Sequence, residues 1–154
     1  MAVILSACSH APAPSRPVAV APPAPPPPPK LVVLLAESDN FPKLAEVTTE
    51  SLMRAQVAGL GEARESKVSL EVVQLSIECI DPTLACYEAV GRSLAADGLL
   101  FAQITVMKRR QLKVAITLFD VAGKTLKTKA EKVFASEEAA AAGLADLVVE
   151  ATRR

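Results

Sequence analysis

Ten prolines between residues 9 and 29 limit where this chain can fold. The segment contains almost only Ser, Ala, Pro and Val, and it ends in a run of consecutive prolines. Proline lacks a backbone N–H and has a fixed φ, so such a stretch joins neither a helix nor a sheet and buries almost nothing. We expect a disordered, extended tether of about 3 Å per residue, with roughly 60 Å of reach. The fold must therefore form from residues 31–154.

The remaining length allows a single hydrophobic core. Of the 154 residues, about 120 are left for a domain, which is a typical size for one core. Hydrophobic residues make up 51% of the sequence but aromatic residues only 3%, so we expect a core of Leu, Val, Ile and Ala. No segment approaches the roughly 18 to 20 continuous apolar residues of a membrane-spanning helix. Any attachment to a membrane must then have another source.

Opposite charges balance over the whole chain but not along it. The numbers of basic and acidic residues are equal, at 17 each, which removes the general attraction to phosphate that nucleic-acid binding usually requires. We therefore expect no nucleic acid among the partners. Between residues 105 and 132, Asp120 and Glu131 offset only part of a basic group, which consists of Lys108, Arg109, Arg110, Lys113, Lys124, Lys127, Lys129 and Lys132. This group predicts a local basic surface.

Two strands and a helix are predicted in the first half of the domain. Residues 31–36 form a continuous apolar run, which is typical of a short strand covered on both faces. Helix-start residues at 39–42 and an apolar periodicity predict a helix that ends near residues 59–61. Residues 67–78 alternate like a strand, and a phase slip near Val72 predicts a bulge.

A second helix and a pair of antiparallel strands are predicted next. Pro82 suits the first turn of a helix, which stops at residues 97–98. Its buried side is predicted to carry Leu84, Tyr87, Val90 and Leu94. Residues 99–107 and 112–119 then form two strands joined by the basic turn of residues 108–111.

A last strand and a last helix complete the predicted fold. A turn in which Gly123 supplies a positive φ leads into a strand over residues 125–134. Ser136 is a predicted cap for the final helix, whose apolar side carries Leu144, Leu147 and Val148. The order β-α-β-α-β-β-β-α predicts an α/β (α+β) fold, with a mixed five-stranded sheet and three packed helices.

Cys79 and Cys86 are close enough in sequence to form a disulfide. The loop between them contains Asp81 and Pro82, and it can fold back until the two Cα atoms reach disulfide distance. In an oxidising compartment the bond would form, and by the chain-entropy model it would add about 2 to 3 kcal/mol to the free energy of unfolding. The alternative is a pair of buried thiols in a reducing compartment.

The segment before the proline tether resembles the lipobox of bacterial lipoproteins. Residues 5–8 read Leu-Ser-Ala-Cys, and in lipoproteins signal peptidase II cuts before such a cysteine, whose thiol carries a diacylglyceryl group. The resemblance implies that Cys8 attaches the chain to the membrane through a lipid. By the same resemblance, Ser9 in place of Asp implies sorting to the outer membrane, with the domain facing the periplasm.

This resemblance divides the chain into three parts. Residues 1–7 would be a truncated signal remnant, residues 8–30 the lipid-bearing cysteine and linker, and residues 31–154 the α/β domain. A signal peptide needs a basic region and an apolar run of about 7 to 15 residues, so we expect a leader encoded upstream of Met1. The alternative is an ordinary apolar N-terminus that happens to contain a cysteine.

Two motifs in the domain resemble the N-terminal domain of TolB and the curli secretion lipoprotein CsgG. Residues 98–104, Gly-Leu-Leu-Phe-Ala-Gln-Ile, follow an Ala-rich helix end, and residues 118–123, Leu-Phe-Asp-Val-Ala-Gly, form a D-x-x-G turn. The resemblance covers about residues 31–152. It implies an α/β fold and an envelope setting, and it implies no reaction.

The sequence offers little catalytic chemistry. The only histidine, His10, lies in the tether, and two cysteines separated by six residues without a histidine do not match a zinc site. Residues 59–61, Gly-Leu-Gly, follow a helix and so lack the context of a phosphate loop. Glu78 and Asp81 are more readily explained as a solvated loop than as an acid/base pair. We therefore expect no enzyme activity, no cofactor and no metal.

The basic residues of the hairpins have two interpretations. Lys127, Lys129 and Lys132 can keep an edge strand from pairing with other chains. Alternatively, a docking surface for an acidic partner, anionic lipid or cell-wall polymer would consist of Lys108, Arg109, Arg110, Lys127 and Lys129.

Two functions are compatible with these features. The first is a non-catalytic adaptor or assembly factor, whose partners are the membrane, through its lipid, and other envelope proteins. The second is a subunit of an outer-membrane secretion or channel complex, which would oligomerise like the curli lipoprotein. The sequence does not determine the oligomeric state.

Overall fold

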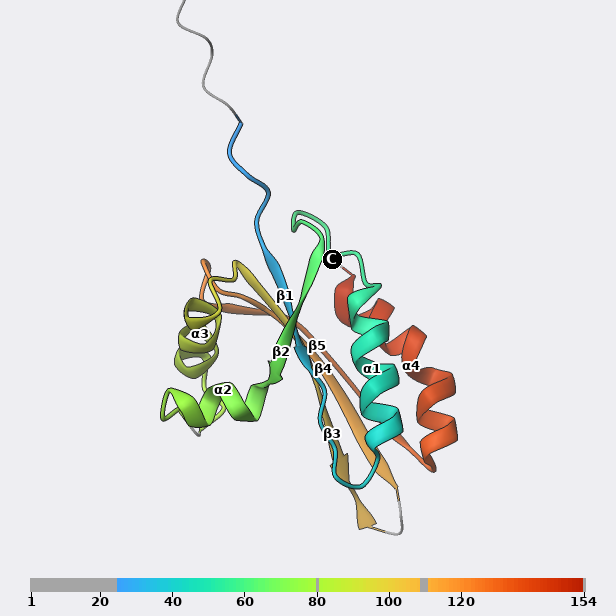
Figure 1. The fold of residues 1–154 in the computed structure, drawn as a ribbon. Coiled ribbons are helices and arrows are strands. Elements are labelled where there is room, and N and C mark those ends of the chain that lie inside the picture. Colours follow the sequence, from blue (N-terminus) through green and yellow to red (C-terminus); the bar gives the residue numbers. More distant parts are fainter. Residues whose placement is uncertain (1–24, 80, 109–110, 154) are drawn as a thin grey trace, which may run out of the picture.

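A mixed five-stranded sheet forms the centre of the computed structural model, which describes residues 25–79, 81–108 and 111–153 (Figure 1). Its strand order is β2-β1-β3-β4-β5. β1 (Leu31–Leu35) pairs in parallel with β2 (Ala63–Ser69) and β3 (Gly98–Val106). The neighbours β3 and β4 (Leu112–Asp120), and β4 and β5 (Thr125–Phe134), are antiparallel. The predicted fold class is therefore confirmed.

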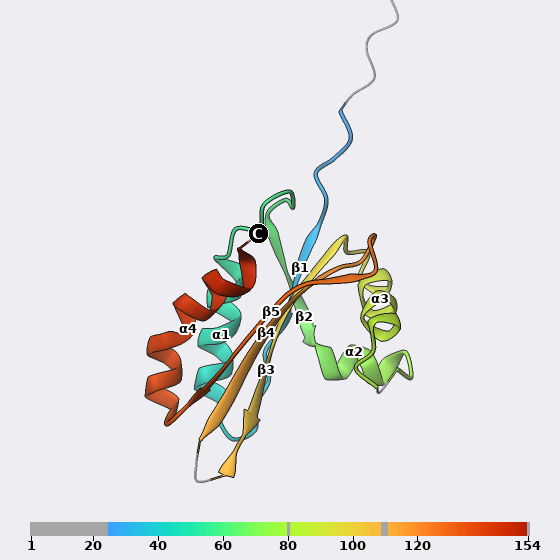
Figure 2. The ribbon, with the colours of Figure 1, turned by 180° about the vertical axis from the view of Figure 1, so that it is seen from behind.

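Helices cover both faces of the sheet. α1 (Pro42–Met53) and α4 (Glu137–Thr152) lie on one face, while α2 (Leu70–Ser76) and α3 (Leu84–Ser93) lie on the other, as opposite views show (Figures 1 and 2). The described residues form four helices, one more than the three predicted. No helix among the described residues is both long and apolar enough to cross a bilayer.

β1 supplies side chains to both halves of the core. Leu31 and Val33 belong to the cluster under α1 and α4, whereas Val32 and Leu34 belong to the cluster under α2 and α3. All four are at most 1% exposed. This alternation confirms that the continuous apolar run is a strand covered on both faces, and β1 links the two halves of the core.

α2 occupies part of the segment that was predicted to be a bulged strand. β2 ends at Ser69, whose side-chain oxygen accepts a hydrogen bond from the Val72 N–H at 3.3 Å and caps the new helix. Leu70 and Val73 are buried three residues apart, which is helical spacing. The phase slip near Val72 therefore marked the start of a helix, and the predicted strand over residues 67–78 is wrong beyond residue 69.

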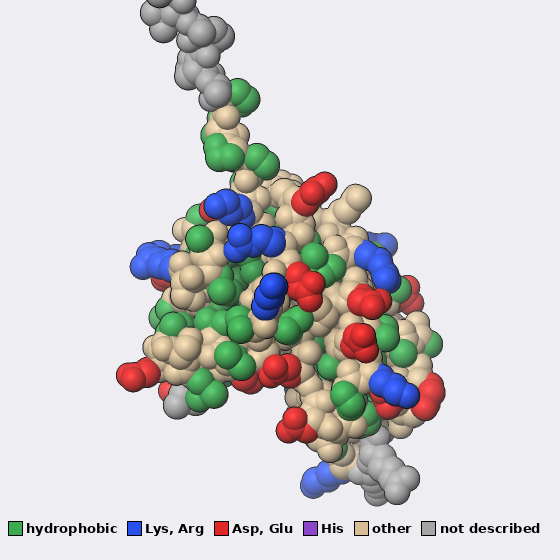
Figure 3. All heavy atoms as spheres, in the orientation of Figure 1, with side chains coloured by type: hydrophobic (Ala, Val, Ile, Leu, Met, Phe, Trp, Pro, Cys, Tyr) green, Lys and Arg blue, Asp and Glu red, His purple; other side chains and the backbone are tan. Residues whose placement is uncertain are grey.

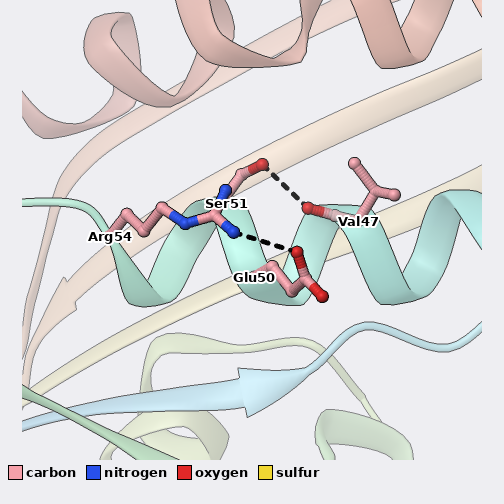
Figure 4. Close-up of polar contacts among 4 residues, drawn as sticks. All are labelled: Val47, Glu50, Ser51 and Arg54. Carbon is pink, nitrogen blue, oxygen red and sulfur yellow. Dashed lines mark hydrogen bonds and ion pairs between the residues drawn. The ribbon is translucent and has the colours of Figure 1, made fainter.

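α1 ends earlier than its sequence pattern predicted. The helix stops at Met53 instead of near residues 59–61. Its last turn carries local contacts at the surface: Arg54 Nη2 lies 3.0 Å from Glu50 Oε2, and the Ser51 hydroxyl donates to the Val47 carbonyl at 2.8 Å (Figure 4). The residues after Arg54 form a loop into β2, and this loop shapes the binding site described below.

Three finer predictions about the second half of the domain are wrong. Pro82 precedes the helix, because the cap of α3 is Thr83, whose hydroxyl accepts from the Cys86 N–H at 3.2 Å. Leu84 is exposed instead of buried. In the β4–β5 turn the positive φ belongs to Lys124, at 52°.

Gly123 serves this turn in another way. Its N–H donates to Asp120 Oδ1 at 2.9 Å, and an added Cβ would lie 2.9 Å from Asp120 Oδ2. The glycine thus allows a close approach of the Asp120 carboxylate. The cap of α4 agrees with its prediction, since the Ser136 hydroxyl accepts from the Ala139 N–H at 3.2 Å.

Candidate binding site

A pocket of about 320 Å³ lies at the end of the sheet where the chain enters β1. Segments far apart in the sequence form its wall: Pro29 before β1, the α1–β2 loop, the end of β4 with the following turn, the start of β5, and Arg153 after α4. This volume lies at the lower end of the range for small ligand sites in proteins. The pocket could therefore accept one or two apolar groups.

The floor of the pocket is apolar. Val57 and Leu60 contribute from the α1–β2 loop, and Leu118 and Phe119 contribute from the end of β4. Val57 and Leu118 are at most 7% exposed and belong to the cluster under α1 and α4, whereas the Phe119 side chain is fully buried in the cluster on the other face of the sheet. These side chains belong to the core and are held by its packing, so the floor is preformed.

Charged side chains lie around this floor, and both carboxylates are already engaged. Asp97 Oδ2 accepts from the Lys30 N–H at 2.7 Å, which fixes the last residue of the linker to the start of β3. Asp120 accepts from the Gly123 N–H and forms an ion pair with Lys127 at 3.0 Å. The backbone hydrogen bond from Gly123, followed by the contact with Lys127, lowers the pKa of the Asp120 carboxyl below its ordinary value of 3.8.

Arg153 places a positive charge at the rim of the pocket. It is exposed, and it forms no ion pair with another described residue. Its position follows from the end of α4, where the Thr128 hydroxyl of β5 donates to the Ala151 carbonyl. The pocket thus combines an apolar floor with one cation that is available to a bound group.

The residues predicted for covalent chemistry lie elsewhere. Cys8, the predicted lipid site, lies outside the described residues. The structure joins Cys79 and Cys86 in a disulfide with a Cα–Cα distance of 5.6 Å, as the sequence predicts. This bond ties the segment after α2 to the first turn of α3. The amide of Gln74 on α2 also lies 3.3 Å from Cys86 Sγ.

The structure separates the basic residues that were predicted to share a docking surface. Lys108 lies at the β3–β4 turn, and Arg109 and Arg110 lie outside the described residues. Lys127 lies near the start of β5, at the opposite end of the sheet from Lys108. At about 3.4 Å per residue of strand, the two lysines are roughly 20 Å apart.

Lys127 and Lys129 lie on the outermost strand, β5, and both have acidic partners. Lys127 pairs with Asp120, and Lys129 Nζ lies 3.2 Å from Glu131 Oε2. Both lysines are exposed on β5, which has β4 as its neighbour on one side only. This position matches the edge-protection hypothesis. Docking through these two residues stays a prediction.

Glu78 and Asp81 both lie exposed in the loop between α2 and α3. Within the described ranges, no three His, Cys, Asp or Glu side chains come together as a possible metal site. Sequence reasoning missed the apolar pocket because its wall combines distant segments. Two motifs noted in the sequence contribute to it, the Gly-Leu-Gly of residues 59–61 and the D-x-x-G motif of residues 118–123, but neither indicated a pocket by itself.

No family model matches the chain, and no curated protein matches it either. Solved structures with a similar arrangement include the LpoB C-terminal domain from Salmonella enterica, with 14% identity, a TM-score of 0.43, and coverage of 70% of this chain and 82% of that one. The PelC dodecamer from Paraburkholderia phytofirmans gives 15% identity, a TM-score of 0.47, and coverage of 81% of this chain and 88% of that one. TolB from Acinetobacter baumannii gives 19% identity, a TM-score of 0.45, and coverage of 83% of this chain but 29% of that one. Likenesses at this level assign neither a function nor a partner to this chain.

Proposed function

We propose that this chain is a lipid-anchored protein of the bacterial envelope whose domain binds other envelope proteins without catalysis. The pocket at the linker end of the sheet is the observation that carries this proposal. It offers a preformed apolar floor and the exposed cation of Arg153. A protein partner would insert an apolar side chain into the pocket and place an acidic group beside Arg153.

The disulfide and the N-terminal sequence support an envelope location. A Cys79–Cys86 bond persists in oxidising compartments such as the periplasm and is rare in the cytosol. Cys8 lies in a lipobox-like sequence, and the proline-rich segment would hold the domain away from the lipid. By resemblance, Ser9 favours the outer membrane, with the domain in the periplasm.

The engaged state of the rim carboxylates supports binding over catalysis. Asp97 is committed to the Lys30 N–H, and Asp120 to its own turn and to Lys127. These contacts shape the pocket and leave neither carboxylate free as an acid or base. The pocket therefore recognises shape and charge, as an adaptor requires.

Filling the pocket should abolish partner binding. Ala122 lines the pocket from an exposed turn, so Ala122→Trp would occupy the space without disturbing the core. Ala141→Trp, on an exposed position of α4, is a matched control of the same size. Each lipidated protein would be cross-linked in native membranes, purified by affinity, and compared by quantitative mass spectrometry. We expect at least a tenfold loss of specific partners for Ala122→Trp and none for Ala141→Trp.

Three results would argue against this proposal. If Ala122→Trp keeps every partner of the unmodified protein, the pocket is not the binding site. If light scattering instead shows a discrete ring of many copies, the second function, a subunit of an outer-membrane secretion or channel complex, is favoured. A Cys8→Ser variant that still sediments with membranes would contradict the lipid anchor.

A further inference from the structure

α2 and α3 together expose an apolar surface, which we call the helix-pair surface. It consists of Val72 and Leu75 on α2 and Leu84 on α3, which are 45%, 66% and 51% exposed. Hydrophobic side chains gather over this part of the molecule (Figure 3). The disulfide and the contact between Gln74 and Cys86 hold the two helices together, so these exposed side chains lie on neighbouring helices.

Acidic side chains surround the helix-pair surface. Glu71 lies on α2, and Glu78 and Asp81 lie in the loop that leads to α3, all of them exposed. The ion pairs among the described residues use none of these three carboxylates. A partner for this surface should therefore be apolar at its centre and positively charged beside it.

The end of the β3–β4 hairpin has this complementary character, and we call it the tip surface. Val106 and Met107 are 49% and 41% exposed, and Lys108 beside them is exposed as well. Lys108 forms no ion pair with another described residue. The tip surface lies at the far end of the sheet, apart from α2 and α3 in both ribbon views (Figures 1 and 2).

We propose that the tip surface of one copy of this chain docks onto the helix-pair surface of a second copy. Met107 and Val106 would cover Leu75 and Leu84, and Lys108 would pair with the surrounding carboxylates. The two surfaces lie apart within one copy, so they meet only between copies. The proposal goes beyond the proposed function and does not depend on it, because neither surface includes the pocket.

Such a contact is head-to-tail. After pairing, one copy keeps a free tip surface and the other keeps a free helix-pair surface, so further copies can add in a row. The tip is small, which places the contact among weak interfaces. Lipid anchoring would raise the local concentration of copies and favour a weak contact at the membrane.

The experiment uses the lipidated full chain on phosphatidylcholine vesicles and a zero-length carbodiimide, which joins a lysine amine to a carboxylate in direct contact. Equal amounts of ¹⁴N- and ¹⁵N-labelled protein are mixed, so that cross-links between copies carry both labels. We expect Lys108 to be linked to Glu71, Glu78 or Asp81 in mixed-label peptides, together with dimers and larger species on a gel.

Two variants test the direction of the contact. Leu75→Asp breaks the helix-pair surface and Met107→Asp breaks the tip surface, and both positions are exposed, so the fold should persist. Each variant alone should yield at least tenfold fewer cross-linked dimers. Their mixture should restore dimers with one copy of each variant, and no larger species. Val149→Asp, a similarly exposed position on α4, is the control and should cross-link like the unmodified chain.

The proposal is overturned if the unmodified chain gives no mixed-label link at Lys108, or if both variants cross-link normally. It is also overturned if the mixture fails to restore dimers, because a symmetric contact between like surfaces would behave in that way. Circular dichroism of each variant checks that the fold persists. Loss of partner binding on filling the pocket is a separate result, so the two proposals fail independently.

Discussion

The two faces of the sheet are covered to different extents. On one face, α1 and α4 have 12 and 16 residues and bury leucines such as Leu52 and Leu144 to 1% exposure or less. On the other face, α2 and α3 have 7 and 10 residues and leave Leu75 and Leu84 more than half exposed. The Cys79–Cys86 disulfide lies on this second face.

This difference separates two ways of holding a helix against a sheet. Burial of apolar surface alone suffices for α1 and α4, at about 25 cal/mol per Å². The short helices α2 and α3 bury less, and a covalent bond compensates by restricting the unfolded chain. The disulfide thereby frees leucines for contacts with other molecules, which is why the helix-pair surface can remain apolar and exposed.

The largest expected effect compares one leucine from each face. Leu144→Ala removes a side chain that is 1% exposed, and we expect a loss of about 3 kcal/mol from the lost transfer energy and the cavity that remains. Leu84→Ala, at a position 51% exposed, should cost less than about 1 kcal/mol. Denaturant unfolding of the two variants measures the difference. Equal losses would mean that both faces depend on burial to the same extent.

The second effect tests the contribution of the disulfide. A Cys79→Ser/Cys86→Ser variant should lose about 2 kcal/mol of stability, since the bond closes a short loop. Hydrogen exchange should accelerate in α2 and α3 and change little in α4, because the bond braces one face only. Uniform acceleration over both faces would contradict this division. Two free thiols in protein from its native compartment, found by alkylation and mass spectrometry, would contradict the bond itself.

The sequence predicted the first face better than the second for a physical reason. The pattern of Leu144, Leu147 and Val148 repeats over a long helix, so its periodicity is unambiguous. α2 has only seven residues, and its Val72 and Val73 fit a strand or a helix equally well. Leu84 matched the buried side of a helix by spacing, but the sheet does not reach it.

The sites show the same limit of sequence reasoning. A pairing of Cys79 with Cys86 is local, so the length of the loop was enough to anticipate it. The pocket depends on the tertiary arrangement that places Leu60 and Leu118 in one wall, and no local pattern encodes that arrangement. Lys108 and Lys127 share a basic stretch of sequence, yet the length of the strands separates them.

A third prediction compares two helix glycines, one packed against the β4–β5 turn and one against β5. An added Cβ at Gly91 of α3 would lie 2.3 Å from Val121 Cγ2, and one at Gly143 of α4 would lie 2.7 Å from Phe134 Cε1. Alanine is favoured over glycine in a helix by about 1 kcal/mol. The Cβ and both methyl groups of Val121 lie within 3.1 Å of the added atom, so we expect Gly91→Ala to destabilise the protein by about 1 kcal/mol.

Gly143→Ala should be closer to neutral, because it meets the far end of the Phe134 ring, which can shift. Thermal unfolding of both variants measures the two effects. A larger loss for Gly143→Ala would show that α4 is packed more rigidly than α3 against the sheet.

The smallest expected effect concerns Asp120 at the pocket, where the β4–β5 turn is stabilised by charge. The pKa of this carboxyl is lowered in the folded protein, first by the Gly123 N–H and then by Lys127. Because the pKa is lower in the folded protein, the charged carboxylate stabilises the fold at pH values above 3.8, the pKa of the unfolded chain. This stabilisation is lost as the pH falls through the lower pKa of the folded protein. The carboxylate is partly exposed, so the amount should stay below about 1 kcal/mol.

Two variants separate the causes at Asp120. Asp120→Asn keeps an acceptor for the Gly123 N–H but removes the charge, so the acid-dependent part of the stability should disappear from its unfolding curves below pH 3.8. Lys127→Gln removes only the ion pair, and most of the acid dependence should remain, because the backbone hydrogen bond is the larger cause. If Lys127→Gln instead removed the dependence as completely as Asp120→Asn, the ion pair would be the main contributor. The turn at the pocket would then rely on β5 and not on its own backbone.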